Sequence, residues 1–170
     1  YTGPTSLALD WVGFRSSDET KSMLDFATAQ TVDDGREALR TWGCPTFNLV
    51  FADTAGDIAY QTSGFLPLRG REMRGYRSLH EPADAWVGFI PLEGLPALVR
   101  PDRGWVVTAN NPTAPPDFPY PLFGTWAPED RAGRAEELIQ STDQHSVEGF
   151  EQFQNDVFSG RAQRGLSGLL

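Results

Sequence analysis

Apolar and polar positions near the start of the chain follow the spacing of α-helices. Over residues 17–30 the apolar positions recur on one face, and Ser17 or Asp18 stands where a helix N-cap is expected. A second helix is predicted over 33–42, because acidic residues occupy its positive N-terminal end and Gly43 follows its last turn. Together they predict a helical hairpin. The residues expected to face the core from the first helix are Met23, Phe26 and Ala27.

The clearest strand pattern lies in the next segment. Residues 47–52 form a mostly apolar run, residues 58–62 form a second one, and a short glycine-containing link joins them. Two such runs around a short link predict a β-hairpin. Because the first run is apolar on both faces, it also predicts a sheet that is covered on both sides. Further strands are predicted at 86–90 and 104–110.

The remaining segments divide into ordered loops and C-terminal helices. Residues 63–103 are rich in Gly, Pro, Arg and Trp and show little periodicity, which is typical of long loops with a function. Helices are predicted over 128–140, with Pro128 at an early position, and over 144–158. No repeat or linker divides the chain. The pattern therefore predicts one α+β unit over residues 1–170 with no internal boundary.

Composition and charge exclude several classes of function. The formal net charge is −9, and such an acidic chain is a poor candidate for binding the phosphate backbone of nucleic acid, which needs clustered Lys and Arg. Its apolar runs are too short to span a bilayer. One Cys and two separated His exclude a zinc site built from Cys and His. Because Tyr1 is not an initiator Met, we expect the chain to be an excised piece of a longer protein.

Two adjacent asparagines at the end of the predicted strand 104–110 are candidates for chemistry. A rigid strand end can present Asn110, whose side-chain amide can donate a hydrogen bond to a developing oxyanion. In the competing interpretation Asn110 and Asn111 only form a turn, and their spacing alone favours the turn. Asp130 and Arg131 begin the following helix. Arg131 either orients a neighbouring group or forms a surface ion pair of little effect, and the local sequence favours the surface pair.

The histidines and the cysteine carry weaker signals. His80 and His145 lack partners at a catalytic spacing, and the adjacent Ser146 does not face His145 on a helix. Both histidines are therefore interpreted as structural or solvated. Cys44 is a candidate nucleophile for a different kind of amide hydrolase, although no His lies near it in the sequence.

Two charged groups complete the candidates. Asp53 and Asp57 flank the hairpin link and either bind a cation or serve as turn residues, for which Asp is common. An arginine cluster between glycines either meets an acidic ligand or partner, or forms salt bridges inside the protein. The second interpretation is favoured. The members of the cluster are Arg69, Arg71, Arg74 and Arg77.

An ordered series of short motifs runs through most of the chain. Examples are NLVFAD at 48–53 and TANN at 108–111. Each motif is weak alone, but their order and spacing are specific, and together they resemble the penicillin acylase family of N-terminal nucleophile hydrolases. Residues 6–11 look like the family strand that carries an Ala-Leu-x-Trp pattern. The other matching segments are 47–60, 64–69, 86–96, 104–111 and 126–139.

The resemblance implies a fold and a catalytic logic. The family fold is a four-layer α/β/β/α sandwich, to which this piece would contribute a helical hairpin, a β-hairpin, further strands and C-terminal helices. A Ser at the start of the large chain attacks an amide carbonyl, with its own α-amino group as the base. Asn110 is implied to donate to the oxyanion, and Arg131 to support the hydrogen bonds of the site. Since Tyr1 is not a nucleophile, the Ser is expected upstream, and the isolated chain is expected to be inactive.

The resemblance also implies substrates, partners and a location. The expected substrates are small-molecule amides of the penicillin, cephalosporin or N-acyl-homoserine-lactone kind. The expected partners are the small chain and the N-terminal part of the large chain, and the expected location is periplasmic or extracellular. No cofactor or metal is assigned: some family members bind calcium, but Pro121 and Leu122 stand near an expected ligand position. Apolar surface left uncovered in a piece of this fold predicts self-association.

A non-catalytic alternative stays open at this point. In this alternative the Gly- and Arg-rich loops at 64–82 form a binding or interaction module. The sequence upstream of Tyr1 would separate the two hypotheses, because the acylase hypothesis expects a Gly-Ser or similar junction there.

Overall fold

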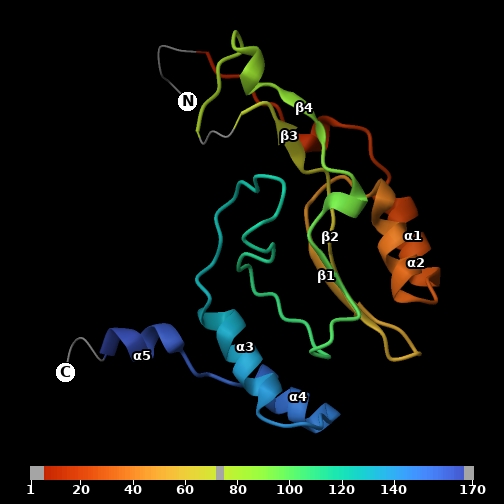
Figure 1. Cartoon of the computed structure of the whole chain (residues 1–170), viewed down its shortest axis with the longest axis vertical. Helices are drawn as coiled ribbons and strands as arrows, with labels where there is room; N and C mark the ends of the chain where they lie inside the picture. The colour runs from red at the N-terminus through yellow and green to blue at the C-terminus, as the bar shows by residue number, and fades with distance from the viewer. Residues whose placement is uncertain (1–5, 72–74, 167–170) are drawn as a thin grey trace.

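The computed structural model describes residues 6–71 and 75–166, which form helices and antiparallel strands. In Figure 1, α1 and α2 lie along one side of the hairpin of β1 and β2, and α3 to α5 lie on the other. The predicted α+β class is confirmed. The helices are α1 (Glu19–Thr28), α2 (Val32–Glu37), α3 (Asp130–Gln140), α4 (Val147–Gln154) and α5 (Gly160–Leu166). The strands are β1 (Asn48–Ala52), β2 (Ile58–Thr62), β3 (Pro67–Arg69), β4 (Trp86–Phe89) and β5 (Ala97–Val99).

The hairpin of β1 and β2 is the centre of an antiparallel sheet. β2 pairs with β1 on one edge and with β5 on the other, so the strand order is β1-β2-β5. β2 is the buried strand, and its Gln61 accepts a hydrogen bond of 3.0 Å from Arg36 of α2. The predicted hairpin is confirmed. β3 and β4 form a second, two-stranded sheet, and neither β3 nor β5 was predicted because each has only three residues.

The helical hairpin also forms, but both helices are shorter than predicted because polar caps define their ends. Asp18 caps α1 by accepting a hydrogen bond of 2.9 Å from the Lys21 N–H. Thr31 and Asp34 form a reciprocal capping box at the start of α2. After α2 the chain tightens into a 3-10 turn at Ala38–Thr41, which replaces the second half of the predicted helix.

The face of α1 expected to be buried was partly wrong. Met23 is 62% exposed and Ala27 is exposed, whereas Phe26 packs against Phe51 of β1 at 5.2 Å between ring centres. The fully buried residue of α1 is Ser22, whose hydroxyl lies in the contact with the 3-10 turn and shares a hydrogen bond with a threonine there. A satisfied hydroxyl can be buried at a helix crossing, so apolar spacing alone did not identify the buried face.

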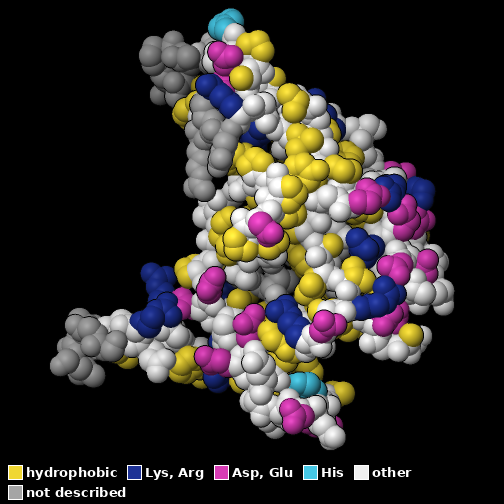
Figure 2. All heavy atoms as spheres, in the orientation of Figure 1, with side chains coloured by type: hydrophobic (Ala, Val, Ile, Leu, Met, Phe, Trp, Pro, Cys, Tyr) yellow, Lys and Arg dark blue, Asp and Glu magenta, His cyan; other side chains and the backbone are white. Residues whose placement is uncertain are grey.

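The prediction that the sheet is covered on both sides is wrong for this chain. Exposed and half-buried residues alternate along β1, and Val50 is 50% exposed while its neighbour Phe51 packs under the helices. The physical reason is that the described residues supply helices closely packed on only one face of β1. Figure 2 shows hydrophobic side chains gathered on the visible face over the middle of the molecule.

Two further predicted strands are wrong in the described chain. Residues 104–110 belong to no strand, and residues 6–11 also lie outside any strand. Trp105 and the two valines after it have strand-like composition, but a strand forms only where a neighbouring backbone edge completes its hydrogen bonds. In the described residues neither segment has such an edge, so composition predicted a strand that pairing does not provide.

The C-terminal helices are shorter than predicted and are held together by ion pairs. α3 begins after Pro128, with Glu129 at its N-cap. No helix of the described chain is long and apolar enough to cross a membrane. Arg134 of α3 makes two hydrogen bonds, of 2.9 and 3.0 Å, to Asp156 beyond α4. Its guanidinium also lies 4.7 Å from the ring centre of Phe158. These contacts fold the chain back after α4, and α5, which was not predicted, follows.

Glu19 connects the start of α1 to the segment before β1. Its carboxylate accepts hydrogen bonds of 3.0 Å from the backbone N–H groups of Gly43 and Cys44. A hydrogen bond from the Ser17 side chain and these backbone donors lower the pKa of Glu19 to about 2. The carboxylate is therefore charged at every pH at which the chain would normally be studied.

We expect Glu19→Gln to lower the free energy of unfolding by about 1 kcal/mol at pH 7, because a partly exposed charge-assisted hydrogen bond is weakened by solvent. The pKa is lower in the folded chain than the unfolded value of about 4.3. The stabilisation from the carboxylate is therefore complete above that value and is lost as the pH falls through about 2. Urea unfolding of both proteins should show the difference shrinking across this range, with Glu151→Gln on exposed α4 as the control. A difference independent of pH would contradict this role for Glu19.

Candidate functional site

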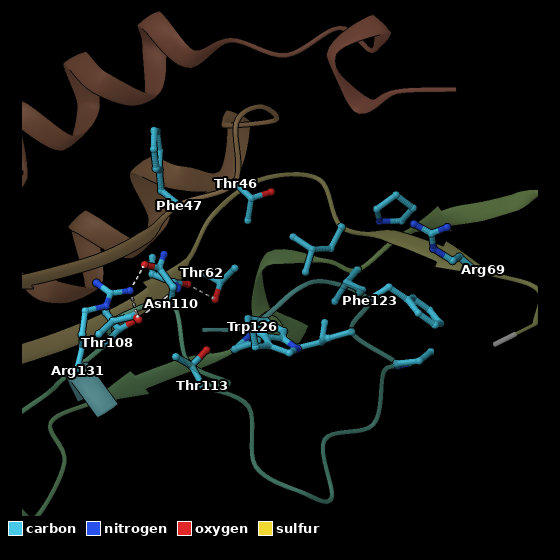
Figure 3. Close-up of a pocket in the computed structure, with 18 residues that line it drawn as sticks. Thr46, Phe47, Thr62, Arg69, Thr108, Asn110, Thr113, Phe123, Trp126 and Arg131 are labelled. Carbon is cyan, nitrogen blue, oxygen red and sulfur yellow. Dashed lines mark hydrogen bonds between the residues drawn. The ribbon is translucent and has the colours of Figure 1, made fainter. Parts of the chain in front are cut away.

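A cavity of about 570 Å³ opens between the hairpin, β3 and the segment that carries Asn110. Figure 3 shows Asn110 and Arg131 together at one end of it and Arg69 at the other, with aromatic side chains between. The walls are mixed, since threonine hydroxyls and asparagine amides alternate with apolar side chains. Residues that line the cavity include Thr62, Thr108, Leu122, Phe123 and Trp126.

Asn110 has a backbone conformation that few residues adopt. Its φ is 64°, in the left-handed region that Asn tolerates better than most residues with a side chain. Its carbonyl oxygen accepts a hydrogen bond of 2.8 Å from the Ala127 N–H. The side chain of Asn111 accepts one of 2.9 Å from the Ala109 N–H and so forms the turn. The turn interpretation therefore holds for Asn111, while the side chain of Asn110 lines the cavity.

Arg131 determines which way the Asn110 amide points. Its Nη2 donates hydrogen bonds of 2.7 Å to Asn110 Oδ1 and of 2.7 Å to the Ala109 carbonyl oxygen (Figure 3). Because a guanidinium can only donate, the oxygen of the amide must face it. The Nδ2 group has no hydrogen-bond partner among the described residues. Asn110 is exposed, so this donor is available to a molecule in the cavity.

The local prediction that Asp130 and Arg131 form a surface pair is wrong. Asp130 pairs with Arg164 of α5, and Arg131 makes its hydrogen bonds to neutral oxygens of the site. Arg131 and Arg164 both lie next to the start of α3, but of these two only Arg131 lines the cavity. The structure thus brings Asn110 and Arg131 together, as the family resemblance implied.

A second set of hydrogen bonds holds the segment around Asn110 against the hairpin. The hydroxyl of Tyr60 donates to Asn48 Oδ1 at 2.8 Å and lies 2.6 Å from the hydroxyls of both Thr62 and Thr113. Asn48 also reaches Thr108, at 3.4 Å. These contacts attach the chain on both sides of the catalytic candidate to the sheet.

The sequence reasoning missed this network, although a signal existed. Tyr60 and Thr62 are two residues apart on β2, and Asn48 lies opposite Thr62 on β1, so all three share one face of the hairpin. Polar groups on one face of an otherwise apolar, buried hairpin need partners, which indicates a polar segment packed there.

The other candidates have structural roles or lie apart. Asp53 accepts a hydrogen bond of 3.1 Å from the Val32 N–H at the start of α2 and others within its own turn, and Asp57 pairs with Arg100. In the described part of the chain no group of three or more His, Cys, Asp and Glu comes together. Tyr1 lies outside the described residues.

The histidines and the cysteine do not form a catalytic group with the cavity. His80 is exposed, and the ring of His145 packs against two phenylalanines of α4, at 5.4 and 6.1 Å between ring centres. Cys44 is a partly buried free thiol whose backbone N–H bonds to Glu19. None of the three lines the cavity that contains Asn110.

The arginine cluster divides rather than acting as one surface. Arg71 pairs with the buried Asp84, and the hydrogen bond from Arg71 together with that from the Ser78 N–H lowers the pKa of this carboxyl. Arg77 also has an interaction partner, and Arg74 lies outside the described residues. Arg69 alone among the described members lines the cavity.

Comparisons with known proteins identify the family of the chain. The family model for penicillin amidase matches residues 2–169, which is nearly the whole chain. The chain belongs to the penicillin amidase family. The match includes residues 64–82, so these loops are part of the family fold rather than a separate module.

Individual relatives support the same family. Penicillin acylase 2 proenzyme from Pseudomonas sp. (strain SE83) is 33% identical over 136 residues, covering 77% of this chain and 17% of that protein. Acyl-homoserine lactone acylase QuiP from Pseudomonas fluorescens (strain Pf0-1) is 30% identical over 166 residues, covering 93% and 20%. A thermostable penicillin G acylase from Alcaligenes faecalis superposes with a TM-score of 0.64 at 25% identity, covering 79% of this chain and 25% of that chain. The chain therefore spans a fifth or less of the length of these curated penicillin amidase relatives.

We expect Tyr60→Phe to lower the free energy of unfolding by about 1–2 kcal/mol, because it removes the hydrogen bonds that its hydroxyl makes with the buried Thr62 and with Asn48 and Thr113. Amide hydrogen exchange should rise most in residues 108–113, because Thr113 contacts this hydroxyl and Thr108 contacts Asn48, which accepts a hydrogen bond from it. Tyr76→Phe is the matched control, since Tyr76 is 78% exposed and should change neither quantity. Unchanged exchange in 108–113 would show that the hydroxyl does not hold this segment.

Proposed function

We propose that the chain is part of an amide-bond hydrolase in which the Asn110 side-chain amide stabilises the oxyanion formed when an acyl amide is attacked. One observation carries this proposal: Arg131 holds the amide oxygen, so that Nδ2 is left as a fixed donor at the cavity. A donor that is oriented before the reaction stabilises developing negative charge without the cost of reorganisation.

Arg131 strengthens this donor in addition to orienting it. A hydrogen bond from a guanidinium to Asn110 Oδ1 draws electron density toward the oxygen and makes the Nδ2–H groups better donors. The positive charge also favours negative charge nearby. Arg131 therefore acts on the reaction through Asn110, as a positioning residue.

Family relationship supports the choice of reaction. The relatives are named penicillin acylases and acyl-homoserine lactone acylases. By this relationship the nucleophile is a Ser, activated by its own α-amino group, in a part of the protein outside residues 1–170. Penicillin-like, cephalosporin-like and N-acyl-homoserine-lactone amides are the substrate classes to test, and a periplasmic or extracellular location is part of the same proposal.

Substitution of Asn110 tests the oxyanion role in the full-length protein that contains this chain. We expect Asn110→Ala to lower kcat by about 10²–10³, with a smaller change in KM, because the hydrogen bond strengthens as charge develops. Asn110→Asp should be at least as damaging, because it keeps an acceptor for Arg131 but replaces the donor with a negative charge. The measurement is steady-state hydrolysis of chromogenic phenylacetyl and fatty-acyl amides.

The control for this experiment is Asn155→Ala. Among the described residues the side-chain amide of Asn155 bonds only to the Glu151 carbonyl at the end of α4, so its loss should leave kcat unchanged. A folded Asn110→Ala protein with the kcat of the wild type would exclude Asn110 from the oxyanion hole.

The uncovered face of β1 implies that the isolated chain self-associates through apolar surface normally covered by other parts of the protein. Light scattering of the purified chain should show an apparent mass that rises with concentration. Val50→Ser should reduce this effect, whereas Val157→Ser, at a residue 95% exposed near the C-terminal helices, should not. A monomer at all concentrations would contradict this expectation.

A further inference from the structure

The charge of the cavity is opposite to that of the chain. The formal net charge of the chain is −9, yet the charged residues among the 18 that line the cavity are two arginines, Arg69 and Arg131. No Asp or Glu of residues 6–71 and 75–166 lines it. A concave site with cations and no carboxylate attracts anions and raises their local concentration.

The surroundings of Arg69 differ from those of most arginines of the described chain. Most of these pair with carboxylates, as Arg71 does with Asp84 and Arg134 does with Asp156. The guanidinium of Arg69 instead lies 5.1 Å from the ring centre of Phe123, and its buried Nε has no hydrogen-bond partner in the described chain.

The Arg69 guanidinium lacks a hydrogen-bond acceptor for its buried Nε in the described chain. Burial, and then the nearby charge of Arg77, lower the pKa of Arg69, which means that its positive charge is disfavoured as the site stands. A buried N–H of a charged group that lacks an acceptor costs free energy. A carboxylate is the acceptor that fits a guanidinium best, because its two oxygens can accept parallel hydrogen bonds.

The position of Arg69 relative to Asn110 indicates where a ligand in the cavity would carry its negative charge. Figure 3 shows Arg69 at the far end of the cavity from Asn110 and Arg131, with Phe123 and Trp126 in between. A molecule that fills the cavity with an amide carbonyl at Asn110 therefore presents its other end to a cation, across an apolar middle.

We propose that Arg69 is a specificity-determining residue that binds a carboxylate of the substrate, so that the site selects amides with an anionic end over neutral ones. This inference rests on the proposed amide hydrolysis for the position of the carbonyl. The guanidinium lies over the Phe123 ring, and this contact limits its orientations, which makes Arg69 a directional site rather than a mobile surface charge.

The test compares acid probes with neutral isosteres in the full-length protein that contains this chain. N-phenylacetylglycine carries its carboxylate on the amine side of the amide, and N-phenylsuccinamic acid carries it on the acyl side. The neutral match for each is the compound with a primary carboxamide in place of the carboxylate. Binding is measured by calorimetry and hydrolysis by amine release, so that affinity is known even for a probe that is not cleaved.

We expect the wild type to bind at least one acid about tenfold more tightly than its carboxamide, the gain typical of one charge-assisted contact. The acid that shows the preference identifies the side of the amide that faces Arg69. Arg69→Gln should remove the preference by weakening the acid alone, and Arg69→Lys should keep part of it. Added salt should weaken binding of the acid but not of the carboxamide.

Arg103→Gln is the matched control, because Arg103 also stacks on an aromatic ring, 4.0 Å from the centre of Trp105, but does not line this cavity. It should leave both affinities unchanged. The proposal is overturned if the wild type shows no preference for either acid, or if Arg69→Gln weakens acid and carboxamide equally.

The two proposals fail in different ways. Hydrolysis of the neutral probes without any acid preference would leave the proposed reaction standing and remove the role of Arg69. An acid preference that Arg69→Gln abolishes, in a protein that hydrolyses none of the probes, would retain the anion site and remove the proposed reaction.

Discussion

The segment that presents Asn110 has no strand neighbour in the described chain, and this constraint governs the rest of the site. Without a ladder of backbone hydrogen bonds, such a segment needs side-chain contacts to keep its position. The Tyr60 hydroxyl does this on one side through Thr113, and Asn48 does it on the other through Thr108. The sheet therefore acts as a rigid base to which the functional segment is attached at two points.

The orientation of the amide depends on a different part of the chain. Arg131 lies in the first turn of α3, so the direction of the Asn110 amide is coupled to the position of this helix. α3 is held in turn by Asp130, which pairs with Arg164 of α5, and by Arg134, which bonds to Asp156. The hairpin thus places the Asn110 backbone, while the C-terminal helices aim its side chain.

Sequence reasoning succeeded where a pattern is local. The apolar runs around a glycine-containing link fix the β1–β2 hairpin, and Asp18 marks the start of α1 through a contact only three residues away. It failed where pairing across the chain decides the outcome. Residues 104–110 have strand composition but no partner edge, and β5 has a partner although its three residues carry almost no pattern.

The same limit applies to the candidate site. From spacing alone Asn110 is a turn residue and Arg131 a surface cation, because neither sequence position shows that the two side chains meet across 21 residues. Only the ordered family motifs indicated the pair. The network around Tyr60 was missed because its members are 12 and 53 residues apart in the sequence, although their shared strand face could have indicated a polar neighbour.

The positions of the two cavity arginines bear on how such a site can be stable. Arg131 is compensated by neutral oxygens that the site needs in fixed positions, whereas Arg69 lies over an aromatic ring and pairs with no carboxylate of the described chain. A cation that is partly buried against Phe123 without a carboxylate lowers the stability of the fold. Such local losses of stability are concentrated at sites where a ligand supplies the missing partner. If Arg69 served only to stabilise the fold, we would expect it to pair with a carboxylate, as Arg71 pairs with Asp84. Because Arg69 has no such carboxylate in the described chain, we infer that its partner comes from outside the described chain.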